Sequence, residues 1–241
     1  MADMLLRLAG VHTHIGPYHI LQDVTLDVPR GGVAVLLGRN GAGKSTTLRT
    51  IMGLWRASAG EILFDGKTIH SLATPEIARS GIAYVPENMG VFSDLTVAEN
   101  MRLAAVDGPF DARRLAWIKD LFPPIATFWD KTAGTLSGGQ KQMLSVARAI
   151  IEPRRLILID EPSKGLAPAI IASMTSALRE LKETDTTILL VEQNFAMASA
   201  LGDTVSVMDD GRIVHAGDMR ALAADAGLQE QLMGLSLEEH Q

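Results

Sequence analysis

The chain of 241 residues contains no cysteine. The sequence therefore excludes a disulfide framework, a thiol nucleophile and a cysteine-ligated metal site. Long hydrophobic runs are missing too: uninterrupted apolar stretches such as residues 33–37 and 188–191 are far shorter than the roughly 18 to 20 residues that cross a bilayer. The first residues show neither a basic segment nor a long apolar one, so we expect no signal peptide and a chain that stays in the cytoplasm.

Positive charge is also scarce, since 22 lysines and arginines stand against 28 aspartates and glutamates and leave a formal net charge of −6. This balance argues against a broad nucleic-acid-binding surface, and we expect no nucleic-acid partner. A local phosphate site is still possible, because backbone N–H groups at a helix start bind anions without basic side chains. What the chain does have is 47% hydrophobic residues, enough to bury a full core.

The order of apolar runs predicts an α/β fold. Residues 5–7 and 21–27 alternate between apolar and polar, so we expect an N-terminal antiparallel β-subdomain. Solid apolar runs then predict strands buried on both faces, with helix-like segments such as residues 44–52 among them. These runs lie at residues 33–37, 82–85, 156–159 and 188–191. The alternation predicts a mostly parallel central sheet.

The pattern changes at about residues 88–152, where we expect an inserted α-helical subdomain. Residues 97–104 and 112–121 have helical periodicity and are followed by the breakers Gly108-Pro109 and Pro123-Pro124. Near the end, the turn Asp209-Asp210-Gly211 between two apolar segments predicts a β-hairpin before a helical tail. No linker or tandem repeat is visible, so residues 1–241 are expected to form one domain.

A glycine-rich segment follows the first solid strand and fits the pattern G-x-x-x-x-G-K-[ST]. Its glycines let backbone N–H groups turn inward around phosphates, and the helix start adds partial positive charge. Lys44 is expected to contact the β- and γ-phosphates, and the Ser45 hydroxyl is suited to Mg²⁺. An ordinary glycine-rich turn is the simpler interpretation, but a chance match arises in roughly one such chain in a hundred. The predicted nucleotide-binding residues are Gly38, Arg39, Asn40, Gly41, Ala42, Gly43, Lys44, Ser45 and Thr46.

Two adjacent carboxylates end the strand at residues 156–159. Alternation along a strand directs neighbouring side chains to opposite sides, so the two should have different roles. Asp160 is assigned to the Mg²⁺ shell and Glu161 to the general base that polarises a water for attack on the γ-phosphate. A solvated acidic turn would be the better interpretation if the chain lacked the phosphate loop.

The segment Leu136-Ser137-Gly138-Gly139-Gln140 opens a second helix, with Ser137 as a good N-cap and two glycines that expose backbone N–H groups. Because one chain already has a phosphate loop, a second anion-binding helix start suggests that it serves the nucleotide of another subunit. LSGGQ is the signature of the ATP-binding cassette (ABC) transporter ATPases, and the chain resembles that family over almost its whole length.

The resemblance implies an ATP-hydrolysing subunit with a P-loop NTPase core that uses ATP and Mg²⁺. It implies a head-to-tail dimer with a second ABC ATPase subunit, identical or paralogous, in which Ser137, Gly138, Gly139 and Gln140 touch the nucleotide of the opposite subunit. It further implies transmembrane permease subunits, whose coupling helix docks on the helical insert, and a location on the cytoplasmic face of the bacterial inner membrane. A periplasmic solute-binding protein is implied indirectly.

The sequence departs from the usual family pattern at two polar positions and one aromatic one. Glu87 stands in place of a glutamine, and its carboxylate can approach Mg²⁺ through water. Gln193 stands in place of the switch histidine, and it can hydrogen-bond the γ-phosphate but cannot carry a proton. The family stacks adenine on an aromatic residue, but here Ile15 aligns with that position and Tyr18 lies nearby, so Tyr18 is either the platform or a packed loop residue.

Three strings, YVPE, LIDEPSKGLAP and VEQN, resemble the amino-acid-uptake branch of the family, particularly the branched-chain amino acid importers. Residues 19–24 and 38–41 also resemble the urea and short-amide relatives. The sequence leaves open an exporter or lipid-extraction subunit and, more remotely, a cassette ATPase without a transport role. Lys164 departs from the small or apolar residue usual before GLAP, and the sequence assigns it no role.

Overall fold

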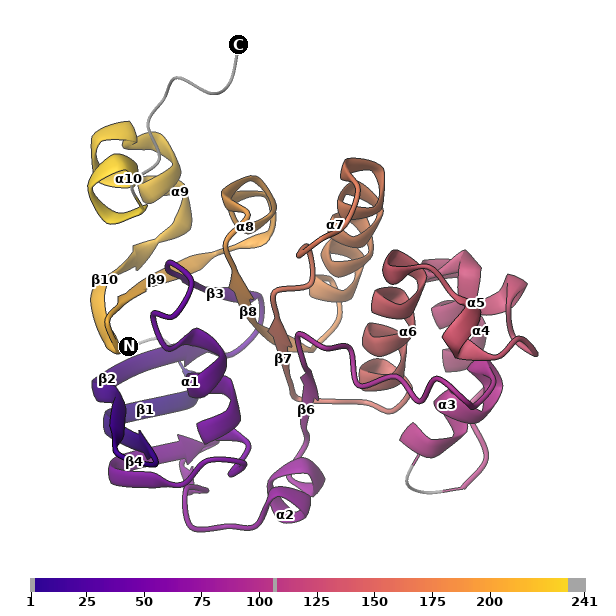
Figure 1. Cartoon of the computed structure of the whole chain (residues 1–241), viewed down its shortest axis with the longest axis horizontal. Coiled ribbons are helices and arrows are strands. Elements are labelled where there is room, and N and C mark those ends of the chain that lie inside the picture. The colour runs from indigo at the N-terminus through magenta and orange to yellow at the C-terminus, as the bar shows by residue number, and fades with distance from the viewer. Residues whose placement is uncertain (1–2, 106–107, 234–241) are drawn as a thin grey trace.

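The computed structural model describes residues 3–105 and 108–233. Ten strands among these residues form two sheets (Figure 1). The smaller sheet is antiparallel, in the order β2-β1-β4-β5. Its strands are β1 Met4–Ile15, β2 Tyr18–Pro29, β4 Ala57–Phe64 and β5 Lys67–Thr68. This confirms the predicted antiparallel N-terminal unit.

The larger sheet has the order β10-β9-β3-β8-β7-β6 and is parallel except for the pair of β9 and β10. Its strands are β3 Val33–Leu37, β6 Ile82–Val85, β7 Leu156–Asp160, β8 Thr187–Glu192, β9 Thr204–Asp209 and β10 Arg212–Asp218. The antiparallel pair is the predicted hairpin, and Asp210 and Gly211 between its strands both have positive φ. The mostly parallel sheet is also as predicted.

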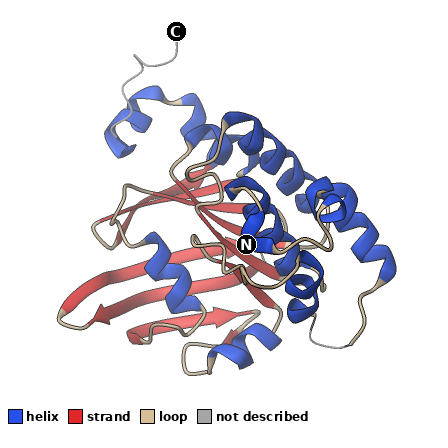
Figure 2. Ribbon diagram, turned by 45° about the vertical axis from the view of Figure 1, so that its right-hand side comes forward, coloured by secondary structure: helices blue, strands red, loops and turns tan. Residues whose placement is uncertain are grey.

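The α-helices lie around these sheets (Figures 1 and 2) and form three successive groups along the chain. The first two belong to the N-terminal part: α1 Lys44–Ile51 and α2 Thr74–Arg79. The next four lie together, away from the smaller sheet: α3 Val97–Ala104, α4 Ala112–Leu121, α5 Pro123–Thr127 and α6 Gly138–Ile150. The last four are α7 Pro168–Lys182, α8 Phe195–Leu201, α9 Met219–Ala224 and α10 Ala226–Met233. We propose that the second group, α3 to α6, is the inserted subdomain, and we call it the helical group.

Strand β3 shows why the central runs are apolar at every position. Val33, Val35 and Leu37 belong to the core under α6, α7 and α8, whereas Ala34 and Leu36 belong to the core between the two sheets. Successive side chains of a strand point to opposite faces, so a strand between two cores must be apolar throughout.

Parallel strands bring their carboxyl ends to one edge of the sheet. Leu37, the last residue of β3, lies beside Glu192 at the end of β8, and Asp160 at the end of β7 lies beside Val191. The segments that leave these three strands therefore meet at one edge, where ligands of open α/β sheets bind. No helix among the described residues is long and apolar enough to span a membrane.

Candidate functional site

The glycine-rich loop at residues 38–43 connects β3 to α1. Gly38 packs so closely on β9 that a Cβ there would lie 2.3 Å from the carbonyl oxygen of Met208. Gly41 and Gly43 have φ of +84° and +109°, which residues with a Cβ rarely adopt. Ala42 is buried, Arg39 and Asn40 are exposed, and Thr46 is half-buried in the first turn of α1. The loop is a backbone concavity directly before a helix start, which is the geometry that binds phosphate.

Lys44 is held at the centre of this loop, with 4% of its side chain exposed. Its Nζ donates to the carbonyl oxygens of Gly38 at 2.8 Å and Arg39 at 3.0 Å, and lies 3.2 Å from Oε1 of Glu161. The side chain is therefore folded back over the loop, and its ammonium group lies between the loop and the end of β7.

The structure brings together Ser45 and Asp160, two of the residues that the sequence analysis assigns to Mg²⁺. The Ser45 hydroxyl donates to Oδ1 of Asp160 at 2.9 Å, and the Tyr84 hydroxyl donates to Oδ2 at 3.2 Å. Burial raises the pKa of Asp160, although these two hydrogen bonds oppose the rise. Burial, together with the nearby charge of Asp160, also raises the pKa of Tyr84 to about 12, so the phenol stays a hydrogen-bond donor at neutral pH.

These oxygens fit the ligand preference of Mg²⁺. A hydroxyl and a carboxylate are hard donors, and Mg²⁺ usually takes only one or two protein oxygens beside water and phosphate. No group of three or more histidines, cysteines or carboxylates that could hold a metal by itself occurs among the residues described. The donor set therefore suits a cation that arrives with a nucleotide better than one in a protein-only cage.

Glu161 leaves the strand in a left-handed conformation, with φ of +47°. A residue with a side chain is strained there by about 1 to 3 kcal/mol, and such strain is concentrated at functional sites. Its amide donates to the carbonyl of Val191 at 2.9 Å, which fixes the turn to β8. The bend, rather than strand alternation, separates Glu161 from Asp160 and gives the two carboxylates different partners.

The Glu161 carboxylate is 7% exposed and lies among donors. Gln193 Nε2 donates to its Oε1 at 2.6 Å and also to Oδ1 of Asn40 at 2.6 Å, so Gln193 bridges the phosphate loop and the carboxylate. Burial works to raise the pKa of Glu161, but the Gln193 hydrogen bond and the charge of Lys44 outweigh it and hold that pKa below its ordinary value. An ionised carboxylate is what a general base requires.

A buried carboxylate, Glu192, ties together the two segments that carry Glu161 and Gln193. It is 1% exposed and accepts hydrogen bonds from the amide of Ser163 at 3.0 Å and the Ser163 hydroxyl at 2.8 Å. It also accepts from the amides of Gln193 and Asn194, each at 3.0 Å. Burial raises the pKa of Glu192, and these four hydrogen bonds oppose the rise. They also lock the turns after β7 and β8 to each other.

Glu87 follows β6 and is part of the same edge. Its Oε1 lies 2.5 Å from Nζ of Lys164, and Lys164 lies 3.6 Å from Oε2 of Glu161. Glu87 and Lys164 both depart from the usual family pattern, and they form an ion pair with each other.

The start of α6 is separate from this edge. Ser137 accepts from the amide of Gln140 at 3.3 Å, and the Gln140 side chain accepts from the amide of Ser137 at 2.9 Å, so the two form a capping box. Gly139 is buried against α7, where a Cβ would lie 2.6 Å from Cγ2 of Ile170. Gly138 is exposed, and a Cβ there would meet nothing within 4 Å. No hydrogen bond joins these residues to the phosphate loop in the described part of the chain.

Tyr18 is the first residue of β2, directly after the turn from β1, and is 69% exposed. Leu21, three residues further on, packs close to the phosphate loop, since a Cβ on Gly43 would lie 3.1 Å from Leu21 Cδ2. The strand that carries Tyr18 therefore runs past the loop, and the exposed ring is free to contact a ligand. The interpretation of Tyr18 as a packed loop residue does not fit its exposure.

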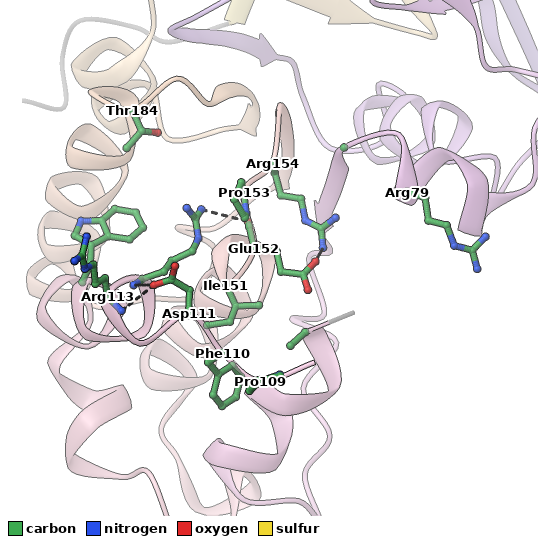
Figure 3. Close-up of a pocket in the computed structure, with 14 residues that line it drawn as sticks. Arg79, Pro109, Phe110, Asp111, Arg113, Ile151, Glu152, Pro153, Arg154 and Thr184 are labelled. Atoms are coloured by element: carbon green, nitrogen blue, oxygen red, sulfur yellow. Dashed lines mark hydrogen bonds and ion pairs between the residues drawn. The ribbon is translucent and has the colours of Figure 1, made fainter. Parts of the chain in front are cut away.

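A cavity of about 750 Å³ lies between the helical group and the core, lined by Phe110, Glu152 and Arg154 among others (Figure 3). Arg114 donates to the backbone carbonyls of Ile150 at 2.6 Å and Glu152 at 3.2 Å. Arg154 pairs with the Glu152 carboxylate at 3.1 Å. None of the predicted site residues lines this cavity, so the predicted chemistry lies at the strand edge instead.

Three residues of the edge were missed by sequence reasoning: Tyr84, Lys164 and Glu192. Tyr84 is an ordinary strand residue in the pattern, and only the pairing of β6 with β7 reveals its contact with Asp160. Glu192 did carry a signal, because a charged residue that ends a solid apolar strand needs partners once it is buried. For Lys164 the signal was its departure from a small or apolar residue directly after the acidic pair.

Comparisons with known proteins show which family and which proteins this chain resembles. The family model for the ABC transporter matches residues 21–164. The high-affinity branched-chain amino acid transport ATP-binding protein BraG of Pseudomonas aeruginosa is 38% identical over 95% of this chain and 100% of BraG. The probable branched-chain amino acid transport ATP-binding protein LivF of Archaeoglobus fulgidus is 34% identical over 96% of this chain and 99% of LivF. A solved ATP-binding subunit of an ABC transporter is 32% identical, with a TM-score of 0.80 over 98% of this chain and 97% of that one.

Proposed function

We propose a function from the premise that this chain belongs to the ABC transporter family of ATP-binding subunits. It is an ATPase of that family, and we propose that it energises an importer of branched-chain amino acids. The observation that carries the chemistry is the contact of Ser45 with Asp160 at 2.9 Å, directly beneath the phosphate loop. The solute is supported by BraG and LivF, both named as branched-chain amino acid transport proteins and both similar to this chain over nearly its whole length.

ATP would be held by residues 38–46, with backbone N–H groups and Lys44 directed at its phosphates. Mg²⁺, when bound, would screen the phosphate charge, and Ser45 and Asp160 are the residues that would hold it. Glu87 lies near enough for its negative charge to act on Asp160, and it would approach Mg²⁺ through a water molecule. Tyr18, exposed on the strand that passes the loop, would support the adenine ring.

Glu161 would take a proton from the attacking water, since its carboxylate is ionised and lies between the phosphate loop and Gln193. Gln193 would orient the reacting groups, because it already hydrogen-bonds Glu161 and Asn40. A glutamine amide cannot carry a proton, so the proposed mechanism assigns proton transfer to Glu161 alone.

A second cassette subunit would complete the site. The exposed Gly138 amide and the helix start at Ser137 would form an anion-binding end, and no hydrogen bond among residues 3–105 and 108–233 joins it to the phosphate loop of its own chain. The chain carries both halves, so a copy of itself is chemically sufficient as the partner. Gln140, which closes the capping box, would fix the helix start rather than bind the phosphate directly.

Permease subunits are the remaining proposed partners. A groove of about 370 Å³ beside β6, lined by Tyr84, Pro86, Met89, Ala104 and Arg148 among others, lies between the core and the helical group and offers a seat for a membrane-subunit helix. In this arrangement the chain would lie at the cytoplasmic face of the membrane, and a solute-binding protein would act on the other side of the permease.

The solute assignment is tested by deleting the gene in its host and measuring uptake of labelled leucine and of labelled urea. Loss of leucine uptake with urea uptake intact, restored by the wild-type chain but not by Asp160→Asn, is the expected result. Loss of urea uptake alone would overturn the assignment in favour of short amides. Intact uptake of both would overturn it as well.

A further inference from the structure

Lys164 links two carboxylates that come from different strands. Its Nζ lies 2.5 Å from Glu87, which follows β6, and 3.6 Å from Glu161, which follows β7. The first contact is a short charge-assisted hydrogen bond. The second is too long for a hydrogen bond but close enough for electrostatic attraction.

The backbone after β7 forces this arrangement. Glu161 has positive φ, and the amide of Lys164 donates to the carbonyl of Glu161 at 3.1 Å, so the chain turns back on itself within three residues. Ser163 inside the turn is anchored by Glu192. Because Glu192 holds this turn through Ser163, the Lys164 side chain passes the Glu161 carboxylate and reaches Glu87.

The two lysines near Glu161 act on different oxygens. Lys44 lies by Oε1, which also accepts the Gln193 hydrogen bond, whereas Lys164 lies by Oε2. Lys44 is committed to the phosphate loop by its contacts with Gly38 and Arg39. Lys164 therefore supplies positive charge to Glu161 from the solvent side, without hydrogen-bonding the oxygen that a base must keep free.

We propose that Lys164 is a positioning residue for ATP hydrolysis, which joins Glu87 to Glu161 and holds the latter in place. The inference rests on the proposed hydrolytic role of Glu161. It also accounts for the glutamate at residue 87, since the lysine neutralises the extra negative charge that this residue adds beside Asp160. Glu87 lies on the segment that leads into the helical group. A movement of that group would therefore shift Glu87 and, through Lys164, change the position of Glu161.

A purely structural role for this pair is a poor fit to its exposure. The Lys164 side chain is 52% exposed and Glu87 36% exposed, and exposed ion pairs contribute little to stability. A matched pair occurs elsewhere: Lys182 lies 2.6 Å from Asp203, with 26% and 49% of the two side chains exposed. Lys182→Met is therefore the control for loss of a surface ion pair that does not involve Glu87 or Glu161.

The test is a double-mutant cycle of Lys164→Met and Glu87→Gln, with Lys164→Arg as the conservative variant. Steady-state ATP hydrolysis, equilibrium ATP affinity and thermal unfolding are measured for each purified chain. Lys164→Met should lower kcat by roughly three- to tenfold, and the double variant should lose less than the product of the two single losses. Lys164→Arg should have the kcat of wild type. In both Lys164 variants, KM, ATP affinity and melting temperature should stay within error of wild type. Lys182→Met should leave kcat unchanged.

Additive losses, or a Lys164→Met kcat equal to wild type, would overturn the role of Lys164. A loss of ATP affinity or melting temperature that matches the loss of kcat would overturn it too. Glu161→Gln distinguishes failure of the proposed function from failure of the inference about Lys164. If that variant hydrolyses ATP like wild type, the assignment of Glu161 as the base is wrong. If it is inactive while Lys164→Met is normal, only the inference about Lys164 has failed.

Discussion

Within the described residues, the helix starts before α1 and before α6 are both suited to phosphate, and they differ in what surrounds them. The loop before α1 faces Asp160, Glu161 and Gln193, which hydrogen-bond or pair with its residues. The start of α6 is closed by its own capping box, and Gly138 faces open space. The first region contains the proposed hydrolytic residues, and the second contains the proposed anion-binding helix start. The difference fits the proposal that each chain contributes two unequal halves to a site shared between subunits.

The largest expected effect lies in the first region. Glu161→Gln removes the proposed base but keeps its shape, so turnover should fall by about 10²- to 10⁴-fold. ATP binding, measured at equilibrium with a labelled nucleotide, should be retained. Turnover near the wild-type value would contradict the assignment of the base.

The next effect separates binding from hydrolysis within that region. Lys44→Ala removes a cation that contacts the loop carbonyls, so ATP affinity should fall by roughly 10- to 100-fold. The same nucleotide titration measures it. Asn40→Ala is a useful control, because it removes a partner of Gln193 but no charge, and it should cost far less affinity.

The two adjacent glycines of the second region give a sharper comparison. A Cβ on Gly139 would clash with Ile170, so Gly139→Ala should destabilise the fold by about 1 to 3 kcal/mol. Gly138→Asp places a carboxylate in open space at a helix start, where it does not harm the helix. It should leave the melting temperature unchanged and abolish turnover, because a negative charge would repel the phosphates of the partner's nucleotide. Equal loss of stability in both variants would remove the distinction.

The smallest effect concerns the helices that support the second region. Hydrogen bonds from the backbone N–H and hydroxyl of Thr96 lower the pKa of Glu99, and those from the amides of Arg114 and Arg113 lower the pKa of Asp111. The stability that these caps contribute is present above their ordinary pKa values of 4.5 and 3.8 and is lost as pH falls through the lower folded values. Hydrogen exchange, corrected for its intrinsic pH dependence, should show α3 and α4 losing protection in acid before β3 does.

Glu99→Gln provides the control for this prediction, since it should weaken protection of α3 already at neutral pH. Loss of protection at one common pH in α3, α4 and β3 would mean that the caps do not set the local stability.

The sequence predicts the first region well because its motifs are local. A glycine loop after one apolar strand, and an acidic pair after another, come to the same edge when both strands are parallel in one sheet, although β8 lies between β3 and β7. The positive φ of Glu161 was beyond reach, because nothing in the residue type demands it. Contacts that depend on strand order, such as those of Tyr84 with Asp160 and of Gln193 with Asn40, also needed the fold.

The second region was harder to interpret from pattern alone. LSGGQ indicates an anion-binding helix start, but it does not say that Gly139 is required for packing on α7 while Gly138 is free. That difference depends on the neighbouring helix, which lies about thirty residues further along the chain. Lys164 is similar, since its partner Glu87 comes from another strand.

The most direct test of the shared site mixes two inactive chains. Lys44→Ala weakens ATP binding at the loop, and Gly138→Asp spoils the helix start. At an ATP concentration that saturates the wild type but not Lys44→Ala, each chain alone should therefore hydrolyse little ATP. Random pairing of equal amounts makes half of the dimers mixed, each with one intact site, and the mixture should recover roughly a quarter of wild-type turnover. A mixture that stays inactive, or a Gly138→Asp chain that hydrolyses ATP normally by itself, would contradict the account.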